Sequence, residues 1–175
     1  ETEESPDITV VPAATVVPAA TVSPSVTAAP DVTATPKADK KDNVIRVSSL
    51  EAGTTDLSQS LKDGAVTVDQ SGSYTISDVT TTNAIVIKAN ANVNLTLKDV
   101  SITAAATSPI LIETGAVLTI TLEGVNTFNA NAKYFPGIAV MATTTEHAKL
   151  FIEGEGQLDI HTTNAQSEGI GTIFT

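Results

Sequence analysis

The sequence has no cysteine and no tryptophan, and it has only two tyrosines and four phenylalanines among 175 residues. The absence of cysteine excludes disulfide scaffolds, cysteine-based zinc sites and thiol nucleophiles. Basic residues are also scarce, with 9 lysines and arginines against 20 acids and a formal net charge of -11. This balance argues against a nucleic-acid partner, because a phosphate backbone is bound by a basic stripe. No apolar run reaches about 18 residues, so we expect no insertion into a membrane.

Proline recurs at every sixth position near the start of the chain, at 6, 12, 18, 24, 30 and 36. The repeat is clearest in Thr9–Ala14 and Thr15–Ala20, which both read TVVPAA. Proline at this spacing breaks helices and removes donors from sheet ladders. We therefore predict a disordered Thr/Pro/Ala/Val linker over residues 1–42, rich in polyproline II conformation, and a folded domain over residues 43–175. Such a stalk, which O-glycosylation could cover, makes most sense outside the cell.

Short aliphatic runs follow the linker and resemble one another at fixed offsets. Leu95-x-Leu97 matches Ile120-x-Leu122 at an offset of 25, and Leu122–Gly124 matches Ile152–Gly154 at an offset of 30. Companion runs contain Ile85, Ile110, Ile138 and Ile170. Each period holds three short strands separated by turns, which is typical of a parallel β-helix.

The fold that we predict is therefore all-β, a parallel β-helix or solenoid of about three to four coils. Leu95, Leu97, Ile120, Leu122 and Ile152 are expected to point into a shared aliphatic interior. The outward residues Thr96, Thr119 and Thr121 are expected to form ladders on a flat face. An antiparallel sandwich or jelly roll is the alternative, because strand spacing alone does not exclude it.

The last coil begins at Gly169–Gly171, shortly before Thr175. A solenoid needs a cap or a further coil to cover its end. We therefore expect the solenoid to be truncated, as part of a longer protein. An uncapped coil edge could also self-associate.

The order and spacing of these runs resemble the cell-surface proteins of clostridia and related Gram-positive bacteria that are called carbohydrate-binding domain-containing proteins. The matching segments are 83–110, 118–128, 136–140, 150–158 and 168–171. The resemblance implies a right-handed parallel β-helix, similar in shape to pectate lyases. It implies an extracellular, non-catalytic protein that binds plant or bacterial cell-wall polysaccharide such as pectin or cellulose. Some members bind calcium in acidic turns, where this chain has Ala-Asn-Ala-Asn at 89–92 and Ala-Thr-Thr-Thr at 142–145.

Sugar binding on an open surface uses aromatic rings against the C–H face of the sugar, with polar groups beside them. The adjacent residues Tyr134 and Phe135 are the aromatic cluster that fits this role, and Tyr134 is the first candidate. Asn129 and Asn131 could add amide hydrogen bonds. The alternative is that Tyr134 only covers a coil edge. The other aromatic side chains expected in the core are Tyr74, Phe128 and Phe151.

Calcium binding would need several oxygen ligands from neighbouring turns. Asn90, Asn92 and Asp99 could supply some of them. The alternative is an asparagine ladder, in which stacked turn asparagines bond to the backbone, and the pattern favours the ladder.

Few residues suggest catalysis. Arg46 is the sole arginine and precedes the repeats, whereas polysaccharide lyases on such a fold need a strong base beside clustered carboxylates. Glu153 and Glu155 flank Gly154 in a turn-like run, so a hydrolase pair is not favoured there. We therefore expect a polysaccharide-binding module displayed on a bacterial cell surface. The alternatives are a structural or adhesive protein with a protein partner, and an enzyme whose catalytic part lies beyond Thr175.

Overall fold

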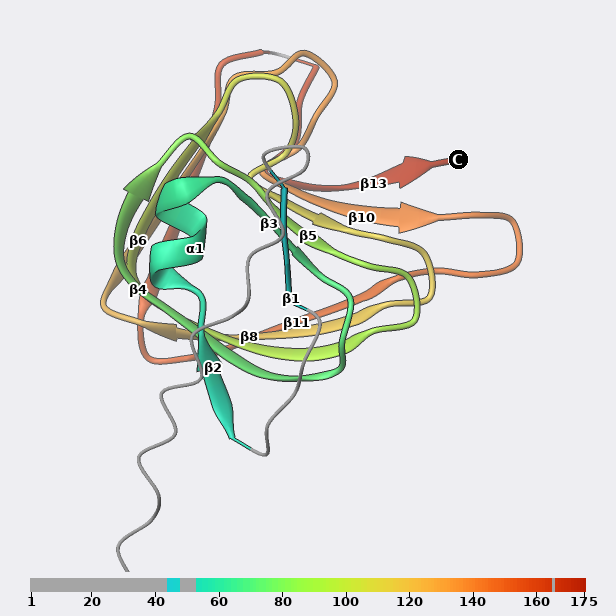
Figure 1. The fold of residues 1–175 in the computed structure, drawn as a ribbon. Helices are drawn as coiled ribbons and strands as arrows, with labels where there is room; N and C mark the ends of the chain where they lie inside the picture. The colour runs from blue at the N-terminus through green and yellow to red at the C-terminus, as the bar shows by residue number, and fades with distance from the viewer. Residues whose placement is uncertain (1–43, 48–52, 165) are drawn as a thin grey trace, which may run out of the picture. The chain divides into compact units, whose positions relative to one another are not determined.

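The structure is a computed structural model that describes residues 44–47, 53–164 and 166–175. The predicted linker, residues 1–42, lies outside the described residues. Most described residues belong to two β-sheets, and one short helix, α1 (Ser58–Asp63), precedes the third strand (Figure 1). No helix in the described ranges is long and apolar enough to cross a membrane.

Sheet A takes its six strands in chain order. They are β1 (Val44–Val47), β3 (Ala65–Val68), β5 (Ile85–Ile87), β7 (Ile110–Ile112), β10 (Ile138–Ala142) and β13 (Ile170–Phe174). Each strand pairs with the next one in a parallel ladder. Ile85, Ile110, Ile138 and Ile170 stand opposite one another along these ladders, as the companion runs predicted.

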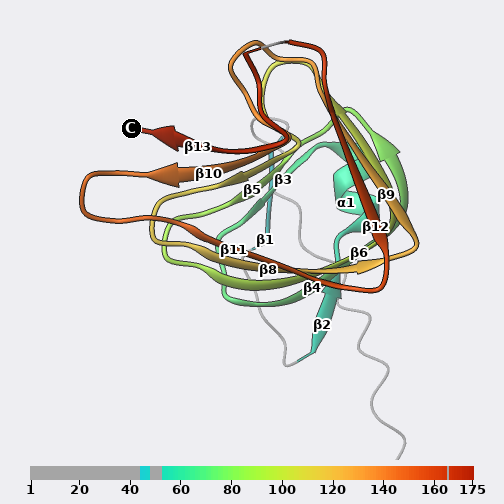
Figure 2. The same cartoon turned by 180° about the vertical axis from the view of Figure 1, so that it is seen from behind.

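Sheet B contains the longer strands, and its ladders are also parallel. Its path runs from β2 (Thr54–Asp56) through β4 (Gly72–Thr81), β6 (Asn92–Ala104) and β8 (Val117–Glu123) to β11 (Lys149–Gly154). Beside this path, β9 (Val125–Ala130) pairs with the second half of β6, and β12 (Gln157–Thr162) pairs with β9 (Figure 2).

The predicted fold class, a right-handed parallel β-helix of about three to four coils, is wrong. The strands form two open sheets that pack face to face, which resembles a two-layer sandwich more than a solenoid of three-stranded coils. Each predicted coil has three short strands, but β4 and β6 each replace two of them with one long strand. These long strands bend at Asp78 and Asp99. The number of strands in sheet A also exceeds the predicted number of coils. The ladders are nevertheless parallel, unlike those of the antiparallel sandwich that was the alternative.

The repeat grows longer along the chain. In sheet B, Ser73 stands opposite Asn94, Asn94 opposite Thr119, and Thr119 opposite Phe151, which gives steps of 21, 25 and 32 residues. The predicted offset of 25 between Leu95 and Ile120 is confirmed. The predicted offset of 30 is wrong, because the recurring Glu-Gly pair suggested a false alignment.

The core lies between the sheets and is almost entirely aliphatic. Leu95, Leu97, Ile120 and Leu122 are buried as expected, and so are Tyr74 and Phe128. Burial of each large apolar side chain contributes about 1.5–3 kcal/mol, so these alternating residues are the main stabilising element. Ile152 stands opposite the buried Ile120 on the inward side, as expected, but it is 39% exposed. The expectation for Phe151 fails, because this side chain is 54% exposed. Phe151 stands opposite the outward residue Thr119 and therefore points away from the core.

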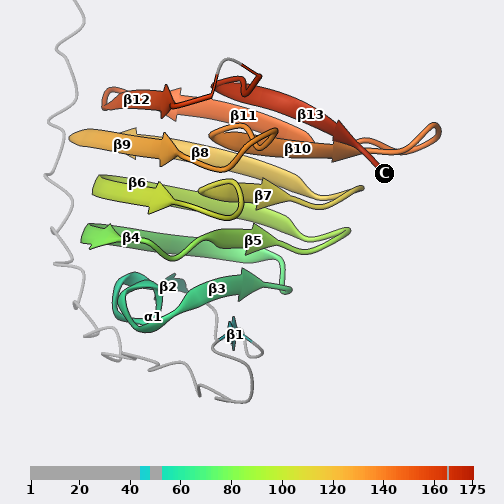
Figure 3. The same ribbon diagram turned by 90° about the horizontal axis from the view of Figure 1, so that it is seen from above.

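Helix α1 packs against β4 at one end of the sheets. Leu57 and Leu61 are fully buried there. The amide of Ser77 in β4 donates to Ser58 Oγ at 2.8 Å, and Asn83 Nδ2 donates to the carbonyl of Leu61 at 2.9 Å. Figure 3 shows α1 beside β3 and the later strands in successive layers. Side-chain hydrogen bonds thus tie both ends of α1 to the neighbouring repeat.

Candidate functional site

The loop between β9 and β10 places one aromatic ring in solvent. Tyr134 is 60% exposed, and the ammonium of Lys133 lies 4.7 Å from the centroid of its ring. Phe135 is only partly exposed, and Pro136 is buried. Of the two predicted aromatic residues, Tyr134 is therefore the one that a large ligand could contact with its full ring.

Backbone hydrogen bonds fix this loop at both ends. The amide of Asn131 donates to the carbonyl of Ala104 at 2.9 Å, and the amide of Gly137 donates to that of Glu168 at 3.1 Å. Tyr134 itself has a φ of 68°, which is rare for a bulky residue. A side chain held in this region costs about 1–3 kcal/mol, and such residues cluster at functional sites. The backbone at Tyr134 is thus held in a strained conformation within a loop that is fixed at both ends.

Asn129 and Asn131 lie on the segment that leads into this loop. Asn129 is partly exposed on the outer face of β9, and its Nδ2 donates to Thr103 Oγ1 at 3.1 Å. The side chain of Asn131 is exposed, and its carbonyl accepts from Asn164 Nδ2 at 3.4 Å. The four predicted binding residues thus lie at the end of β9 and in the loop that follows it, with Asn129 and Asn131 before Tyr134 and Phe135.

The three predicted calcium ligands do not converge. Asn92 begins β6, and Asp99 lies seven residues further along the same strand, which corresponds to about 23 Å at about 3.3 Å per residue. Asn90 occupies the turn before β6 with a φ of 64°. Among the described residues, no cluster of three or more His, Cys, Asp or Glu side chains could hold a metal ion. A single calcium ion bound by Asn90, Asn92 and Asp99 is therefore not proposed.

Asp99 instead bonds to the backbone of the next repeat. It has a φ of 53°, and its Oδ1 accepts from the amide of Val125 at 2.9 Å. The equivalent bend in the following repeat is Gly124, with a φ of 60°. A Cβ at Gly124 would lie 2.1 Å from Asp99 Oδ1, so the carboxylate position requires glycine there.

A buried asparagine completes the same corner, and the sequence analysis did not identify it. Asn126 is fully buried in β9. Its Oδ1 accepts from the amide of Val100 at 3.1 Å, and its Nδ2 donates to the carbonyls of Glu123 and Gln157 at 3.0 and 3.2 Å. One side chain therefore joins three successive repeats. Asparagine bonding between repeats therefore occurs at the buried Asn126, in addition to the bond from Asn164 Nδ2 to the carbonyl of Asn131.

A shallow open pocket of about 680 Å³ lies beside this corner. Residues 121–125 and 154–157 line it. Glu123 and Glu155 both lie in its lining and are exposed. Glu153 is not among the lining residues, although its Oε1 accepts from Oγ1 of the lining residue Thr121 at 3.4 Å.

Hydroxyl and amide side chains form rows on the outer face of sheet B. Ser73, Asn94 and Thr119 make one row, and Thr75, Thr96 and Thr121 make the next. These residues are exposed or partly exposed. The predicted threonine ladder is confirmed for Thr96 and Thr121, which stand directly opposite each other. Adjacent strands are about 4.8 Å apart, so the rows offer a regular set of donors and acceptors.

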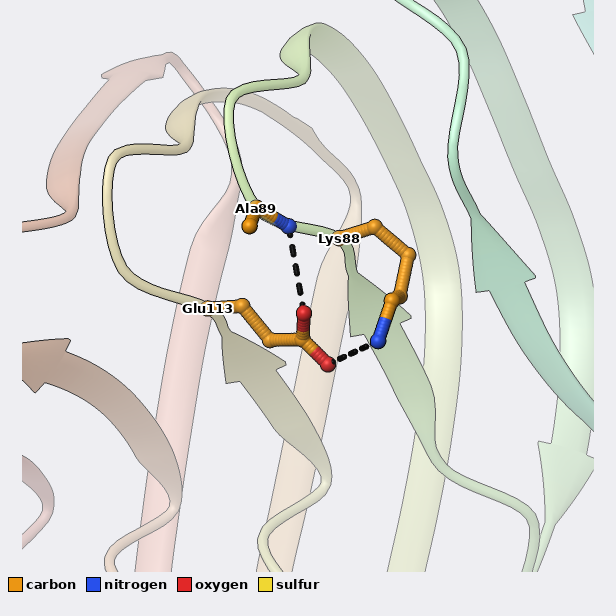
Figure 4. A network of polar contacts seen from close by, with 3 residues as sticks. All are labelled: Lys88, Ala89 and Glu113. Carbon is orange, nitrogen blue, oxygen red and sulfur yellow. Dashed lines mark hydrogen bonds and ion pairs between the residues drawn. The ribbon is translucent and has the colours of Figure 1, made fainter. Parts of the chain in front are cut away.

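Two further polar features serve the scaffold. Lys88 and Glu113 form an ion pair between the turns after β5 and β7, and Glu113 also accepts from the amide of Ala89 at 3.2 Å (Figure 4). Tyr74 is buried and donates to the carbonyl of Gln70 at 3.0 Å. Burial raises the pKa of Tyr74 above its ordinary value, and the negative charge of Asp69 adds to this effect.

The comparison with known families now gives these features a context. The sequence model of one family, described as carbohydrate-binding domain-containing protein, matches residues 62–172, which is more than half of the chain. The chain belongs to this family. No curated protein and no solved structure matches it significantly. The matched range of this carbohydrate-binding domain includes both Tyr134 and the outer rows of sheet B.

Proposed function

We propose that this carbohydrate-binding domain is a non-catalytic module for cell-wall polysaccharide, and that Tyr134 is its main contact. The observation that carries this proposal is the exposed ring of Tyr134 at the apex of a loop fixed at both ends. Aromatic rings combine a large apolar face with little loss of conformational freedom on binding. The family match supports carbohydrate as the ligand class.

The openness of the surface favours a polymer over a free monosaccharide. Small-molecule sites are usually concave and enclose most of the ligand. Here the Tyr134 ring and the side chain of Asn131 are exposed, and no enclosed pocket surrounds them among the described residues.

Lys133 offers a means to distinguish neutral from acidic polysaccharides. Its ammonium lies beside the Tyr134 ring and is exposed. A polymer of uronic acids such as pectin would pair its carboxylates with this charge, and the binding would weaken with salt. Cellulose carries no charge, so Lys133→Gln would leave its binding unchanged.

Binding to insoluble cellulose, polygalacturonate and peptidoglycan tests the proposal. We expect Tyr134→Ala to weaken retention at least about fivefold, because an aromatic contact contributes about 0.5–1.5 kcal/mol beyond the area that it buries. Tyr134→Phe keeps the ring and should retain binding. Val125→Ala, at an exposed position on β9, is the matched control. Equal retention of Tyr134→Ala and the unsubstituted chain, or no retention on any glycan, would overturn the proposal.

We further propose that residues 1–42 act as an extended stalk that displays the domain on the cell surface. The hexad prolines support this proposal, because they disfavour both helix and sheet. A polyproline II segment rises by about 3.1 Å per residue. Small-angle scattering of the full chain and of residues 43–175 should therefore give clearly different maximum dimensions. Equal dimensions would contradict the stalk.

A further inference from the structure

The outer face of sheet B carries an exposed aromatic ring that the Tyr134 site does not use. Phe151 in β11 is 54% exposed, and it stands opposite the outward residue Thr119 of β8. Its side chain therefore lies on the broad face of the sheet and not in the plane of the ladder. A further strand beside β11 would extend this face rather than cover it, because paired strands lie side by side in one sheet.

Two parallel rows of uncharged hydroxyl and amide side chains lie on the same face. They consist of Ser73, Asn94 and Thr119, and of Thr75, Thr96 and Thr121. The first row ends at Phe151, which continues it on the next strand. Adjacent strands are about 4.8 Å apart, and alternate residues along a strand are about 6.6 Å apart. The six polar side chains therefore form a flat and regular grid with an apolar ring at one corner.

The charge of this face differs from that of the whole chain, whose formal net charge is -11. The charged outward residues of β6, β8 and β11 balance one another. Lys98 stands opposite Glu123, and Lys149 and Glu153 lie two residues on either side of the ring. Asp56 of β2, at the far end of the second row, adds one negative charge. A neutral ligand rich in hydroxyl groups is complementary to such a surface, whereas a polyanion is not attracted to it.

The outer face of sheet B is separate from the Tyr134 loop. Figure 2 shows the loop between β9 and β10 at the top of the view, and β8 and β11 along the bottom. The chain bends at Gly124, and β9 then leads away from the face towards the loop. The six residues of β9 span about 20 Å at about 3.3 Å per residue. Phe151 and Tyr134 therefore lie too far apart to contact the same sugar unit.

We propose that the outer face of sheet B is a second polysaccharide-binding site, with Phe151 as its apolar contact and an uncharged chain such as cellulose as its ligand. The ligand class rests on the proposed function, whereas the position and the preference for a neutral chain rest on the face itself. The ring packs against the C–H face of one sugar, and the polar rows exchange hydrogen bonds with hydroxyl groups of the neighbouring units. With two separate sites, one domain holds two chains or two stretches of one chain, which strengthens its overall retention.

Combined alanine variants distinguish the two sites. On insoluble cellulose, we expect Phe151→Ala to weaken retention of the protein at least about threefold, both alone and together with Tyr134→Ala. Val125→Ala is the matched control, because Val125 is also 54% exposed but lies on β9. If the double variant is retained as well as Tyr134→Ala alone, the second site is overturned and the proposed function stands. If only Phe151→Ala reduces retention, the second site stands and the role of Tyr134 is overturned.

The polar rows can be tested with little change in shape. The double variant Thr96→Val with Thr121→Val keeps β-branched side chains, which suit a strand, and removes two hydroxyl groups. We expect it to weaken retention on cellulose about threefold or more, without lowering the denaturation midpoint, because hydrogen bonds to the sugar are lost. Thr80→Val removes an exposed hydroxyl group of β4 beyond the bend at Asp78 and is the control. Equal retention of the double variant and this control would contradict the proposal.

Salt and ligand charge test the preference for a neutral chain. Because Tyr134→Ala leaves only the outer face to bind, we expect its retention on cellulose to stay constant between about 0.05 and 0.5 M salt. We also expect this variant to bind cellulose roughly tenfold better than polygalacturonate, whose charges the face does not neutralise. Equal binding to the two polymers would contradict the neutral ligand. Complete loss of cellulose binding in Tyr134→Ala would overturn the second site.

Discussion

The two ends of the stacked sheets differ in how far the apolar core is covered. At the end near β2, helix α1 buries Leu57 and Leu61 and bonds to β4 through Ser58. At the end near β11 and β13, the same kind of aliphatic column reaches solvent at Ile152, Ile170 and Phe174. The comparison shows that parallel pairing alone does not close a core. Within the described residues, α1 covers the core at one end, whereas apolar side chains are exposed at the other.

The largest expected effect is a difference in unfolding free energy between the two ends of the sheets when a large aliphatic side chain is replaced by alanine. We expect Leu61→Ala to destabilise the domain by about 2–5 kcal/mol, because it removes a fully buried side chain. Ile152→Ala should cost less than about 1 kcal/mol in the monomer, because its side chain is already partly in water. Chemical denaturation at low protein concentration measures both. Equal losses would show that the exposed end is covered in solution.

Asn126 tests how firmly the open end is attached to the rest. We expect Asn126→Ala to cost about 1–3 kcal/mol, because it leaves the buried amide of Val100 without its partner and removes the bonds to the partly buried carbonyls of Glu123 and Gln157. Hydrogen exchange should then accelerate first in β12. As a control, Ser108→Ala removes a buried hydroxyl that has no partner among the described residues and should leave stability nearly unchanged. A loss from Asn126→Ala no larger than from Ser108→Ala would refute the bridging role.

Tyr74 supplies a pH probe in β4, the strand against which α1 packs. Its pKa is raised in the folded state, so the neutral phenol is favoured by folding. This contribution is fully present below the unfolded pKa of about 10 and is lost as the pH rises through the folded pKa. We expect denaturation midpoints to fall above about pH 10, and Tyr74→Phe to reduce that fall. An identical alkaline slope in both proteins would contradict the assignment.

The smallest effect is expected midway between the ends, at the ion pair of Lys88 and Glu113. Both side chains are partly exposed, with 44% and 24% of their surface accessible. Such pairs contribute about 0–1 kcal/mol, so Lys88→Met should change stability by less than about 1 kcal/mol. Thermal melting at low and high salt checks this, since the difference should shrink with salt. A larger loss would indicate that the turns after β5 and β7 depend on this pair.

The strands could be predicted from the sequence because alternating aliphatic residues mark them directly. Pairing of Leu95 with Ile120 and of Ile85 with Ile110 follows from the offset of 25. The arrangement into two open sheets could not be predicted. The alternating pattern also does not show that β4 and β6 continue through Asp78 and Asp99, where single left-handed residues bend the strands and shift the alternation.

The candidate site was predicted in part. Tyr134 was identified by its aromatic character, and the adjacent Lys133 could have been found from the sequence because it directly precedes the ring. Asn126 was missed, since an isolated polar residue in a strand normally indicates an exposed position. Phe151 was assigned to the core because Leu150-Phe151-Ile152 is a continuous apolar run, which hides the alternation of the two faces.

The steps of 21, 25 and 32 residues in sheet B leave the paired strands in register while the connecting segments lengthen. The Tyr134 loop belongs to one of these longer connections. Evolution could therefore alter ligand preference by lengthening or exchanging such segments, without re-engineering the hydrophobic interior that supports them.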